Sequence, residues 1–386
     1  MRDSLNVDID KIFSGNIIKE NREYIFSYKT QDKNQFISLT MPVREKNYIG
    51  INLFPIFEMH LPEGYLLSII KKHFSKILKT DEFGLLKLTA KNIKTRITYE
   101  GVDAYLSDSL SLENLIHPKD ENLFDELVNR FALRSSLSGV QPKVLATVED
   151  KATLSLDEYI VKSWGDDYPH LALNEYYCMS VLKKAGVRVP RFYISDDNKL
   201  FIMKRFDIKE DRSYLGFEDM CVLQAKQRDD KYEGSYEAIA KSIKIFVSPR
   251  HRKNALRQLF KMVVINSMVK NGDGHLKNFG LVYDGYEDIN IAPAYDVVCT
   301  TMYIKKDIPA LSLLGSKKWW NKKLLFRFAL ESCELTNKDT NKLYDECVIA
   351  IKEVSLEVQK DMKSYSNQEK IFLEELLEIF SNENSV

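Results

Sequence analysis

The densest group of reactive side chains in the sequence lies in one short run, Asn271-Gly272-Asp273-Gly274-His275-Leu276-Lys277-Asn278. An apolar stretch with helical periodicity precedes this run and a β-like stretch follows it, so that the polar residues gather at one turn. Asp273 and Asn278 have the Asp-x4-Asn spacing of kinase catalytic loops, in which the aspartate accepts the proton of the substrate hydroxyl and the asparagine oxygen helps to hold Mg²⁺. The two glycines would let this backbone approach a triphosphate closely.

A second acidic residue, Asp296, ends the segment Ala292-Pro293-Ala294-Tyr295-Asp296, behind another β-like run. Mg²⁺ binds one or two carboxylates together with phosphate oxygens, whereas the base must stand separately beside the nucleophile. The sequence therefore predicts Asp273 as the base, and Asn278 and Asp296 as ligands of Mg²⁺.

These assignments have plainer alternatives. Taken alone, residues 271–278 are equally well explained as an Asn-Gly and Asp-Gly turn between a helix and a strand. The second acidic residue and the order of the strands favour the catalytic loop. His275 by itself is more often structural than catalytic, and we interpret it as a residue that orients the loop or a phosphate.

A candidate phosphate-binding lysine, Lys162, ends the apolar run Tyr159-Ile160-Val161-Lys162. Its expected partner is Glu175 in the helix that follows, because in protein kinases such a pair fixes the lysine on the α- and β-phosphates. The alternative is a lysine that snorkels to the surface and a glutamate on an exposed helix face.

The sequence contains neither GxxxxGK[ST] nor GxGxxG, which excludes a P-loop NTPase as the source of phosphate binding. Ahead of Lys162 stands a turn of small residues, Ser135-Ser136-Leu137-Ser138-Gly139-Val140-Gln141-Pro142-Lys143. Its backbone N–H groups could cup phosphates. By spacing alone, this turn is weak evidence for a nucleotide site.

The pattern of elements divides the chain into a small first unit and a larger second region. Residues 1–130 contain short alternating runs and a helical stretch, which together indicate an α+β module. From 131 to about 207, short β-rich runs surround one helical stretch at 171–185. From about 208 to 386 the chain is mainly helical, notably at 253–270. The expected fold class is α+β, with a β-rich lobe followed by an α-rich lobe.

Composition limits the classes of protein and partner. The 386 residues are 44% apolar, enough for a sizeable core, and 56 basic residues balance 56 acidic ones, so no net field attracts nucleic acid or a membrane. The five scattered cysteines form no CxxC pair, which favours buried, reduced thiols. Charges near the N-terminus exclude a signal peptide and no apolar run approaches a membrane span, so we expect a cytoplasmic protein.

Taken together, these segments resemble the HipA family of bacterial toxin kinases, whose fold is related to the protein kinases and the phosphatidylinositol kinases. The resemblance covers roughly residues 10–320. Besides the motifs above, the matching segments are Asn174-Glu175-Tyr176-Tyr177-Cys178, Lys204-Arg205-Phe206-Asp207 and Phe57-Glu58-Met59-His60-Leu61-Pro62-Glu63-Gly64. The family implies a protein-kinase-like two-lobed fold, with a β-rich N-lobe and an α-rich C-lobe, behind an N-terminal α+β subdomain.

The resemblance also implies roles for individual residues. It implies Asp273 as base, Asn278 and Asp296 on Mg²⁺, and Ser136 as a site of inhibitory autophosphorylation. The ATP-binding residues that it implies are Ser138, Gly139, Val140, Gln141, Pro142 and Lys143 over the nucleotide, Lys162 on phosphate, Lys204, Arg205 and Phe206 beside the adenine, and His275, Leu276, Lys277, Asn278, Tyr295 and Asp296 around the catalytic loop.

The activity and partners that the family implies are those of an ATP- and Mg²⁺-dependent serine/threonine protein kinase. Family members act on translation, typically by phosphorylating an aminoacyl-tRNA synthetase, and are held inactive by a helix-turn-helix antitoxin, HipB, that binds operator DNA. The chain departs from the family at Lys204, where several relatives carry an acidic residue, which leaves backbone contacts at the hinge. Residues 322–386 are helical by pattern and carry no motif that assigns antitoxin contacts.

Two other functions compete with the toxin kinase. A small-molecule kinase of the aminoglycoside phosphotransferase type would share the two-lobe plan and the Asp-x4-Asn loop but would not need residues 1–130. A catalytically silent, ATP-binding co-repressor would act only through the antitoxin and DNA. The presence together of Lys162, Asp273, Asn278 and Asp296 argues against a silent protein.

Overall fold

The computed structural model describes residues 3–61, 81–90, 93–99, 110–117, 143–150, 155–163 and 168–381. The chain forms two compact units, of which the first comprises residues 1–163, 195–230 and 282–287 and the second residues 164–194, 231–281 and 288–386. The first unit holds most of the strands and the second most of the helices, in agreement with the expected α+β class. The domain boundary expected near residue 130 lies outside the described ranges.

A five-stranded antiparallel sheet forms the N-terminal part of the first unit. In spatial order its strands are β4 (Tyr48–Gly50), β3 (Glu23–Tyr28), β2 (Ile12–Glu20), β1 (Asp3–Ile9) and β5 (Ile97–Tyr99). Alternating side chains such as Ile17 and Phe26 are fully buried on the core side. The helices α1 (Pro55–Glu58) and α3 (Glu82–Thr89) add Phe57 and Phe83 to the same core.

A second sheet of the first unit carries Lys162. Its strands in this unit, in spatial order, are β6 (Leu110–Ser111), β7 (Lys143–Asp150), β8 (Ser155–Ser163) and β10 (Leu200–Lys204), with α4 (Leu112–Ile116) directly after β6. β8 and β10 run antiparallel, with Lys162 opposite Phe201 and Tyr159 opposite Lys204. β7 and β8 confirm two of the short β-rich runs that the sequence predicts between residues 131 and about 207.

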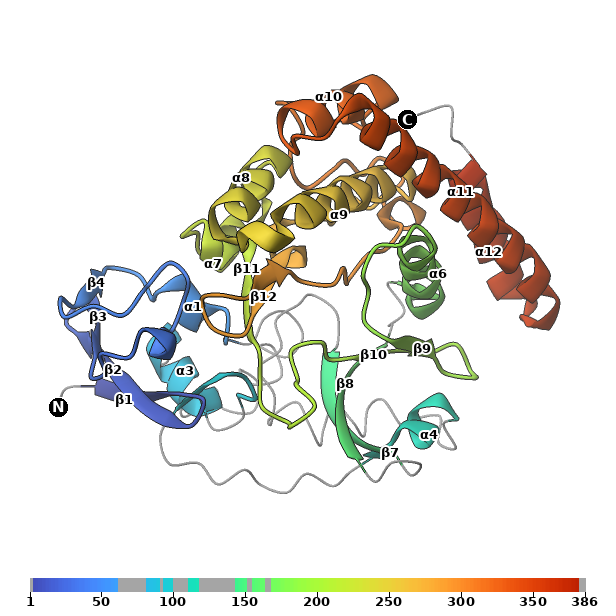
Figure 1. The fold of residues 1–386 in the computed structure, drawn as a ribbon. Helices are drawn as coiled ribbons and strands as arrows, with labels where there is room; N and C mark the ends of the chain where they lie inside the picture. Colours follow the sequence, from blue (N-terminus) through green and yellow to red (C-terminus); the bar gives the residue numbers. More distant parts are fainter. Residues whose placement is uncertain are drawn as a thin grey trace. The chain divides into compact units, whose positions relative to one another are not determined.

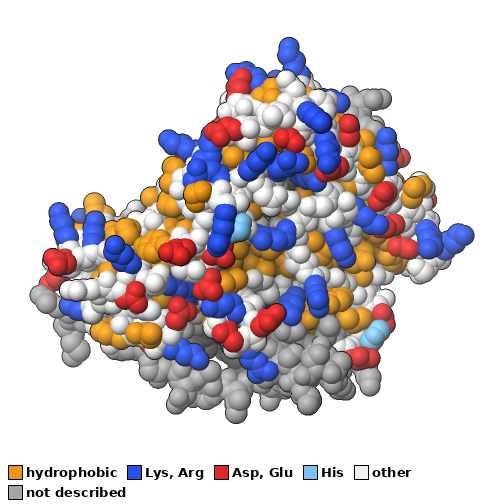
Figure 2. All heavy atoms as spheres, in the orientation of Figure 1, with side chains coloured by type: hydrophobic (Ala, Val, Ile, Leu, Met, Phe, Trp, Pro, Cys, Tyr) orange, Lys and Arg blue, Asp and Glu red, His pale blue; other side chains and the backbone are white. Residues whose placement is uncertain are grey.

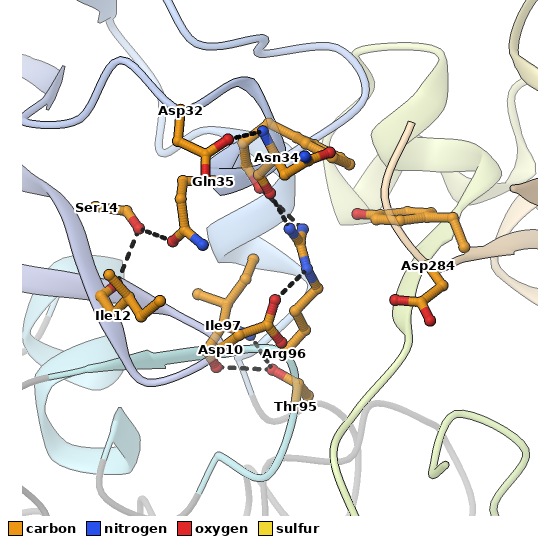
Figure 3. A network of polar contacts seen from close by, with 12 residues as sticks. Asp10, Ile12, Ser14, Asp32, Asn34, Gln35, Thr95, Arg96, Ile97 and Asp284 are labelled. Atoms are coloured by element: carbon orange, nitrogen blue, oxygen red, sulfur yellow. Dashed lines mark hydrogen bonds and ion pairs between the residues drawn. The ribbon is translucent and has the colours of Figure 1, made fainter. Parts of the chain in front are cut away.

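Arg96 connects the N-terminal sheet to the segment 282–287 of the same unit. Figure 3 shows its guanidinium between Asp10, whose carboxylate lies 3.1 Å from Nε, and the backbone of the 3₁₀ turn η1 (Lys33–Gln35). Arg96 also donates to the carbonyl oxygen of Phe36 at 3.0 Å and lies over the Phe36 ring. That ring stacks on Tyr286, with centroids 4.0 Å apart. A single buried cation thereby fixes three segments that are distant in sequence.

Glu218 is a second buried anchor of the first unit. It lies in β11 (Gly216–Asp219), just ahead of α7 (Met220–Leu223), and is fully buried. Its carboxylate accepts hydrogen bonds from the Ser38 hydroxyl at 2.7 Å, the Leu39 N–H at 2.8 Å and the Tyr283 hydroxyl at 2.7 Å. The Tyr283 ring crosses Gly216 so closely that a Cβ there would lie 2.0 Å from it, and only glycine fits. Burial raises the pKa of Glu218 to about 7.

Helices build most of the second unit. Its helices are α6 (Leu171–Lys184), α8 (Tyr236–Phe246), α9 (Pro249–Met268), α10 (Lys322–Glu331), α11 (Asn337–Asp361) and α12 (Asn367–Ser381). In Figure 1, α9 lies between α8 and α11, and it contacts both. Residues 259–268 of α9 are all buried, so that helix is the centre of this unit. The helix predicted at 253–270 begins earlier because Pro249 suits the first turn, where its missing N–H is not needed.

The segment between α9 and α10 contains the predicted catalytic loop. Its elements are the 3₁₀ turn η4 (Leu276–Asn278), β12 (Gly280–Tyr283), β13 (Ile289–Ile291) and the 3₁₀ turn η5 (Thr300–Met302). The remaining short elements in the described ranges are β9 (Phe192–Ile194), η3 (Arg228–Tyr232) and η6 (Met362–Ser364). The helix predicted at 171–185 is confirmed as α6. The helix ends just before Gly186, whose φ of +72° is left-handed.

The surface carries charges of both signs close together. Figure 2 shows lysine and arginine side chains interspersed with aspartate and glutamate on the visible face, as the equal totals of 56 basic and 56 acidic residues predict. Among the helices of the described ranges, none is both long and apolar enough to span a membrane.

Replacing the buried carboxylate, Glu218→Gln, should change how stability depends on pH. The folded-state pKa of about 7 lies above the ordinary glutamate value of 4.5, so the favourable contribution of the protonated group is full below about pH 4.5 and is lost as pH rises through 7. We expect the stability of the wild type relative to Glu218→Gln to fall between pH 5 and pH 8, by roughly 2 to 3 kcal/mol. Urea unfolding of both proteins at several pH values measures this difference.

The control for this experiment is Glu45→Gln, which removes an exposed carboxylate of the same unit. Its stability difference from the wild type should be constant over the same pH range. Parallel pH profiles for the wild type and Glu218→Gln would show that Glu218 does not titrate in the folded protein in this range.

Candidate active site

The predicted catalytic loop follows α9 directly. After Lys270, whose φ of +55° is left-handed, Asn271 donates from its backbone to the carbonyl oxygen of Asn266 at 2.8 Å, and its side-chain amide bonds the Asn266 side chain at 3.1 Å. The N–H of Asp273 in turn donates to the side-chain oxygen of Asn271 at 3.2 Å. The loop backbone is therefore held by a helix whose C-terminal half is buried. Asp273, which is half-buried, projects from this fixed backbone.

Gly272 is pressed against the segment 300–307. Its N–H donates to the Thr300 hydroxyl oxygen at 2.7 Å, and a Cβ at this position would lie only 2.0 Å from a carboxylate oxygen of Asp307. That oxygen is also 2.5 Å from the Thr300 hydroxyl. The absence of a side chain at Gly272 thus allows this close approach within the protein itself, and a larger residue would have to displace the Asp307 carboxylate.

Asn278 connects the loop to Asp296. The side-chain amide of Asn278 donates to Asp296 Oδ2 at 2.8 Å, while its oxygen accepts from the His275 N–H at 3.0 Å. One residue earlier on each segment, the Tyr295 hydroxyl donates to the carbonyl oxygen of Lys277 at 2.7 Å. Asp296 has a φ of +60°, a left-handed conformation that is uncommon for aspartate and that clusters at functional sites. The structure therefore brings Asn278 and Asp296 together.

His275 is buried in the loop and stays neutral. The residue is 7% exposed, and its Nδ1 atom is buried with no hydrogen-bond partner among the residues that the structure describes. Burial, with a smaller contribution from Lys231, lowers the pKa of His275 to about 3. At neutral pH the imidazole therefore carries no charge to offer a phosphate, and its backbone orients Asn278.

Tyr232 was not predicted, and it contacts the predicted base. Its hydroxyl donates to Asp273 Oδ1 at 3.0 Å, and its ring packs edge-on against His275 with centroids 5.2 Å apart. The residue comes from the 3₁₀ turn before α8, far from the loop in sequence. No periodicity or motif at residues 228–234 signals this contact.

Asn174, like Tyr232, is a residue to which the sequence motifs assign no individual role. It lies on the buried face of α6 and makes two hydrogen bonds with the backbone of Cys299. Its Nδ2 donates to the Cys299 carbonyl oxygen at 3.0 Å, and its Oδ1 accepts from the Cys299 N–H at 2.7 Å. These bonds fix the segment that leads from Asp296 to η5. The available signal was a carboxamide among apolar helix positions, since a buried polar group needs partners.

Both members of the predicted lysine–glutamate pair are buried. Lys162 in the first unit is 4% exposed, with its ammonium 5.8 Å from the centre of the Phe201 ring, and Glu175 on α6 in the second unit is 1% exposed. The alternative of a snorkelling lysine and an exposed glutamate is therefore wrong.

The other nucleotide-site candidates of the first unit lie at the ends of its strands. Lys204 ends β10, and Lys143 begins β7 opposite Lys162. Arg205 pairs with Asp207, 2.9 Å from Nε to Oδ1, so its charge is engaged within the unit. The Phe206 ring packs edge-on against Phe217. Six candidates lie outside the described residues: Ser136, Ser138, Gly139, Val140, Gln141 and Pro142.

Asn278 and Asp296 fit Mg²⁺ by the chemistry of their donor atoms. Carboxamide and carboxylate oxygens are hard ligands, and Mg²⁺ in nucleotide sites takes one or two carboxylates with phosphate oxygens and water. Over the described part of the chain, no three His, Cys, Asp or Glu side chains converge into a metal site of their own. A site with one carboxylate and one carboxamide would therefore depend on nucleotide phosphates for its remaining ligands.

Comparison with known proteins gives matches along most of the chain. Residues 135–355 match the family model described as "HipA-like C-terminal domain", and residues 5–100 match the "HipA N-terminal domain". A proposed kinase of Sinorhizobium fredii, Y4dM, is 28% identical over 74% of this chain and 71% of its own length. A proposed kinase of Haemophilus influenzae is 29% identical over 47% of this chain and 59% of its own length.

A solved structure has the same fold. A chain of the Shewanella oneidensis MR-1 toxin–antitoxin complex of HipA, HipB and operator DNA superposes with a TM-score of 0.73 at 18% identity, covering 98% of this chain and 96% of that chain. The expected protein-kinase-like fold with an N-terminal subdomain is thereby confirmed.

The two hydrogen bonds between the Asn174 side chain and the Cys299 backbone predict a large loss of stability for Asn174→Ala. The change leaves a buried N–H and a buried C=O without their partner, at about 1 to 3 kcal/mol each, so we expect a loss of roughly 2 to 6 kcal/mol in urea unfolding. The Cys299 amide should also exchange its hydrogen faster. Asn341→Ala, on an exposed turn of α11, is the matched control and should cost less than about 0.5 kcal/mol. Equal losses in the two variants would contradict the anchoring role of Asn174.

Proposed function

The chain belongs to the HipA family, and from this premise we propose that it is an ATP- and Mg²⁺-dependent serine/threonine protein kinase that acts as the toxin of a toxin–antitoxin pair. The observation that carries the proposal is the hydrogen bond between Asn278 and Asp296. Asn278 lies five residues after Asp273, and Asp296 follows strands β12 and β13. This arrangement separates a base from a pair of metal ligands, which is what phosphoryl transfer to a hydroxyl needs.

In the proposed mechanism, each side chain has one task. The oxygen of the acceptor hydroxyl attacks the γ-phosphorus of ATP, and the bond from that phosphorus to the β,γ-bridging oxygen breaks. Asp273 accepts the proton that the hydroxyl loses. Asn278 and Asp296 would hold Mg²⁺, which neutralises charge on the phosphates when bound. Lys162, supported by Glu175, binds the α- and β-phosphates.

The remaining nucleotide contacts are also proposed from the family resemblance. Residues 138–143 form the loop over the nucleotide, and Lys204, Arg205 and Phe206 lie beside the adenine. Because Arg205 is paired with Asp207, we assign its contribution to backbone atoms. Leu276, Lys277 and Tyr295 complete the site by shaping the catalytic loop, since the Tyr295 hydroxyl bonds the Lys277 backbone.

The partners that we propose are a HipB-like antitoxin, operator DNA bound through that antitoxin, and a protein substrate from translation such as an aminoacyl-tRNA synthetase. The fold match to a chain of a HipA, HipB and operator DNA complex supports the first two. The match of residues 5–100 to a HipA N-terminal domain favours this function over a small-molecule kinase, which would not need that region.

The two acidic residues should fail for different reasons when each is replaced. Asp273→Asn removes the proton acceptor, so transfer of ³²P from γ-labelled ATP should drop by about 10² to 10⁴-fold while ATP still binds. Asp296→Asn removes a metal ligand, so the Mg²⁺-dependent affinity for ATP should fall as well. Calorimetric titration with ATP, with and without Mg²⁺, separates the two effects.

Asp345→Asn, a change at an exposed carboxylate of α11, is the control and should leave both transfer and binding as in the wild type. Undiminished turnover in either Asp273→Asn or Asp296→Asn would exclude the kinase assignment.

Ser136 is the proposed site of self-inactivation, by analogy with the family. A phosphate adds about −1.5 to −2 charges and three acceptor oxygens. Within a loop that covers ATP, it would be repelled by the nucleotide phosphates or would form an ion pair with a basic side chain near it in sequence, such as Arg134. We expect Ser136→Ala to stay active during long incubation with ATP and Mg²⁺ while the wild type loses activity. Peptide mapping after incubation locates the phosphate, and modification confined to other residues would rule out this switch.

A further inference from the structure

The hydroxyl group of Tyr232 occupies a hydrogen-bonding position on the proposed base. It donates to Asp273 Oδ1 at 3.0 Å, which is the kind of bond that an acceptor hydroxyl makes with a catalytic aspartate before transfer. A carboxylate oxygen that already accepts this proton is a poorer acceptor for a second hydroxyl. The structure therefore shows the base engaged by the protein itself.

The surroundings of Tyr232 allow this engagement to be reversible. The side chain is 41% exposed, and Asp273 is half-buried, so the phenol reaches the base from the solvent side. On its inner side the ring meets the edge of His275, and the Lys231 ammonium lies 5.1 Å from its centroid. Exposed side chains change rotamer on a picosecond to nanosecond scale, so the phenol can leave Asp273 without disturbing the core.

The backbone of Tyr232, in contrast, is held in place. Lys317 donates from its ammonium to the Tyr232 carbonyl oxygen at 3.3 Å, and Gly234, two residues on, accepts from the Ser312 N–H at 3.2 Å. A fixed backbone with a partly exposed ring is suited to return the phenol to the same carboxylate after each displacement. A side chain that served only packing would not place its polar atom on the base.

We infer that Tyr232 gates the proposed base: in the absence of an acceptor its hydroxyl occupies Oδ1 of Asp273, and an acceptor hydroxyl that gives its proton to this oxygen must displace the phenol. The inference rests on the proposed function, because it assigns Asp273 the role of base. It adds a positioning residue that selects for acceptors able to displace a phenol, and it keeps water from using the base between substrates.

Hydrolysis of ATP tests the gate without knowledge of the protein substrate. In this reaction the oxygen of water attacks the γ-phosphorus, the bond to the β,γ-bridging oxygen breaks, ADP leaves and the proton of water passes to Asp273. At Oδ1 of Asp273 the phenol would compete with this water. Tyr232→Phe removes the hydroxyl and keeps the ring, so the base becomes available to water.

The full-length protein is assayed for phosphate release from ATP with Mg²⁺. We expect Tyr232→Phe to raise kcat about ten- to a hundredfold, the scale of losing one hydrogen bond to a charged group, with KM for ATP unchanged. In an Asp273→Asn background the same change should give no increase, because the effect acts through the base. Tyr365→Phe, which removes a hydroxyl bonded to Tyr177 at 2.8 Å near α12, is the matched control and should leave kcat as in the wild type.

The outcomes separate the gate from the proposed function. A wild type that transfers phosphate neither to water nor to itself would overturn both. An active wild type with a Tyr232→Phe variant that is equally fast or slower would overturn the gate alone, as would an increase that persists in the Asp273→Asn background. Phosphate found on Tyr232 by peptide mapping would also overturn it, since the phenol would then be an acceptor.

Discussion

The hydrogen bond between the Asn278 amide and the Asp296 carboxylate is the constraint on which the candidate site depends. It joins two segments separated by the β12 and β13 strands, so the two side chains meet only if these strands are in register, as the bond from the Ala292 N–H to the Gly280 carbonyl shows. The neighbouring bond from Tyr295 to Lys277 repeats the connection one residue earlier. Two adjacent bonds of this kind hold Asp296 in a left-handed conformation that would otherwise cost about 1 to 3 kcal/mol.

Buried polar groups hold the loop on its other sides. Thr300 accepts from Gly272, and Asn174 bonds both backbone groups of Cys299, so α6 and the segment after Asp296 are positioned by hydrogen bonds as well as by apolar packing. In a low-dielectric interior such bonds are specific, because a displaced partner would leave a buried group unsatisfied. The loop is therefore preorganised, which is how a phosphoryl-transfer site lowers its barrier.

The N-terminal region is structurally part of the first unit. Residues 1–163 cluster with 195–230 and 282–287, and Glu218 bonds Ser38 and Leu39 of that region together with Tyr283 of β12. Arg96 makes a similar connection through Phe36 to Tyr286. A region that shares a buried carboxylate with the strand following the catalytic loop is more than a module tethered by a linker, because its loss would unpair groups elsewhere in the unit.

The sequence by itself predicted the candidate chemistry. Asp273, Asn278 and Asp296 could be grouped because their spacing and side-chain types suit a base and two metal ligands, and α6 and α9 could be located because buried helices carry a local periodicity. The residues around Ser136 remain a prediction. Only the tertiary structure decided that Tyr232 reaches Asp273, that His275 is buried and neutral, and that Asn174 and Glu218 anchor distant segments. These contacts join residues far apart in the chain, and long-range packing leaves no local periodic signal in a single sequence.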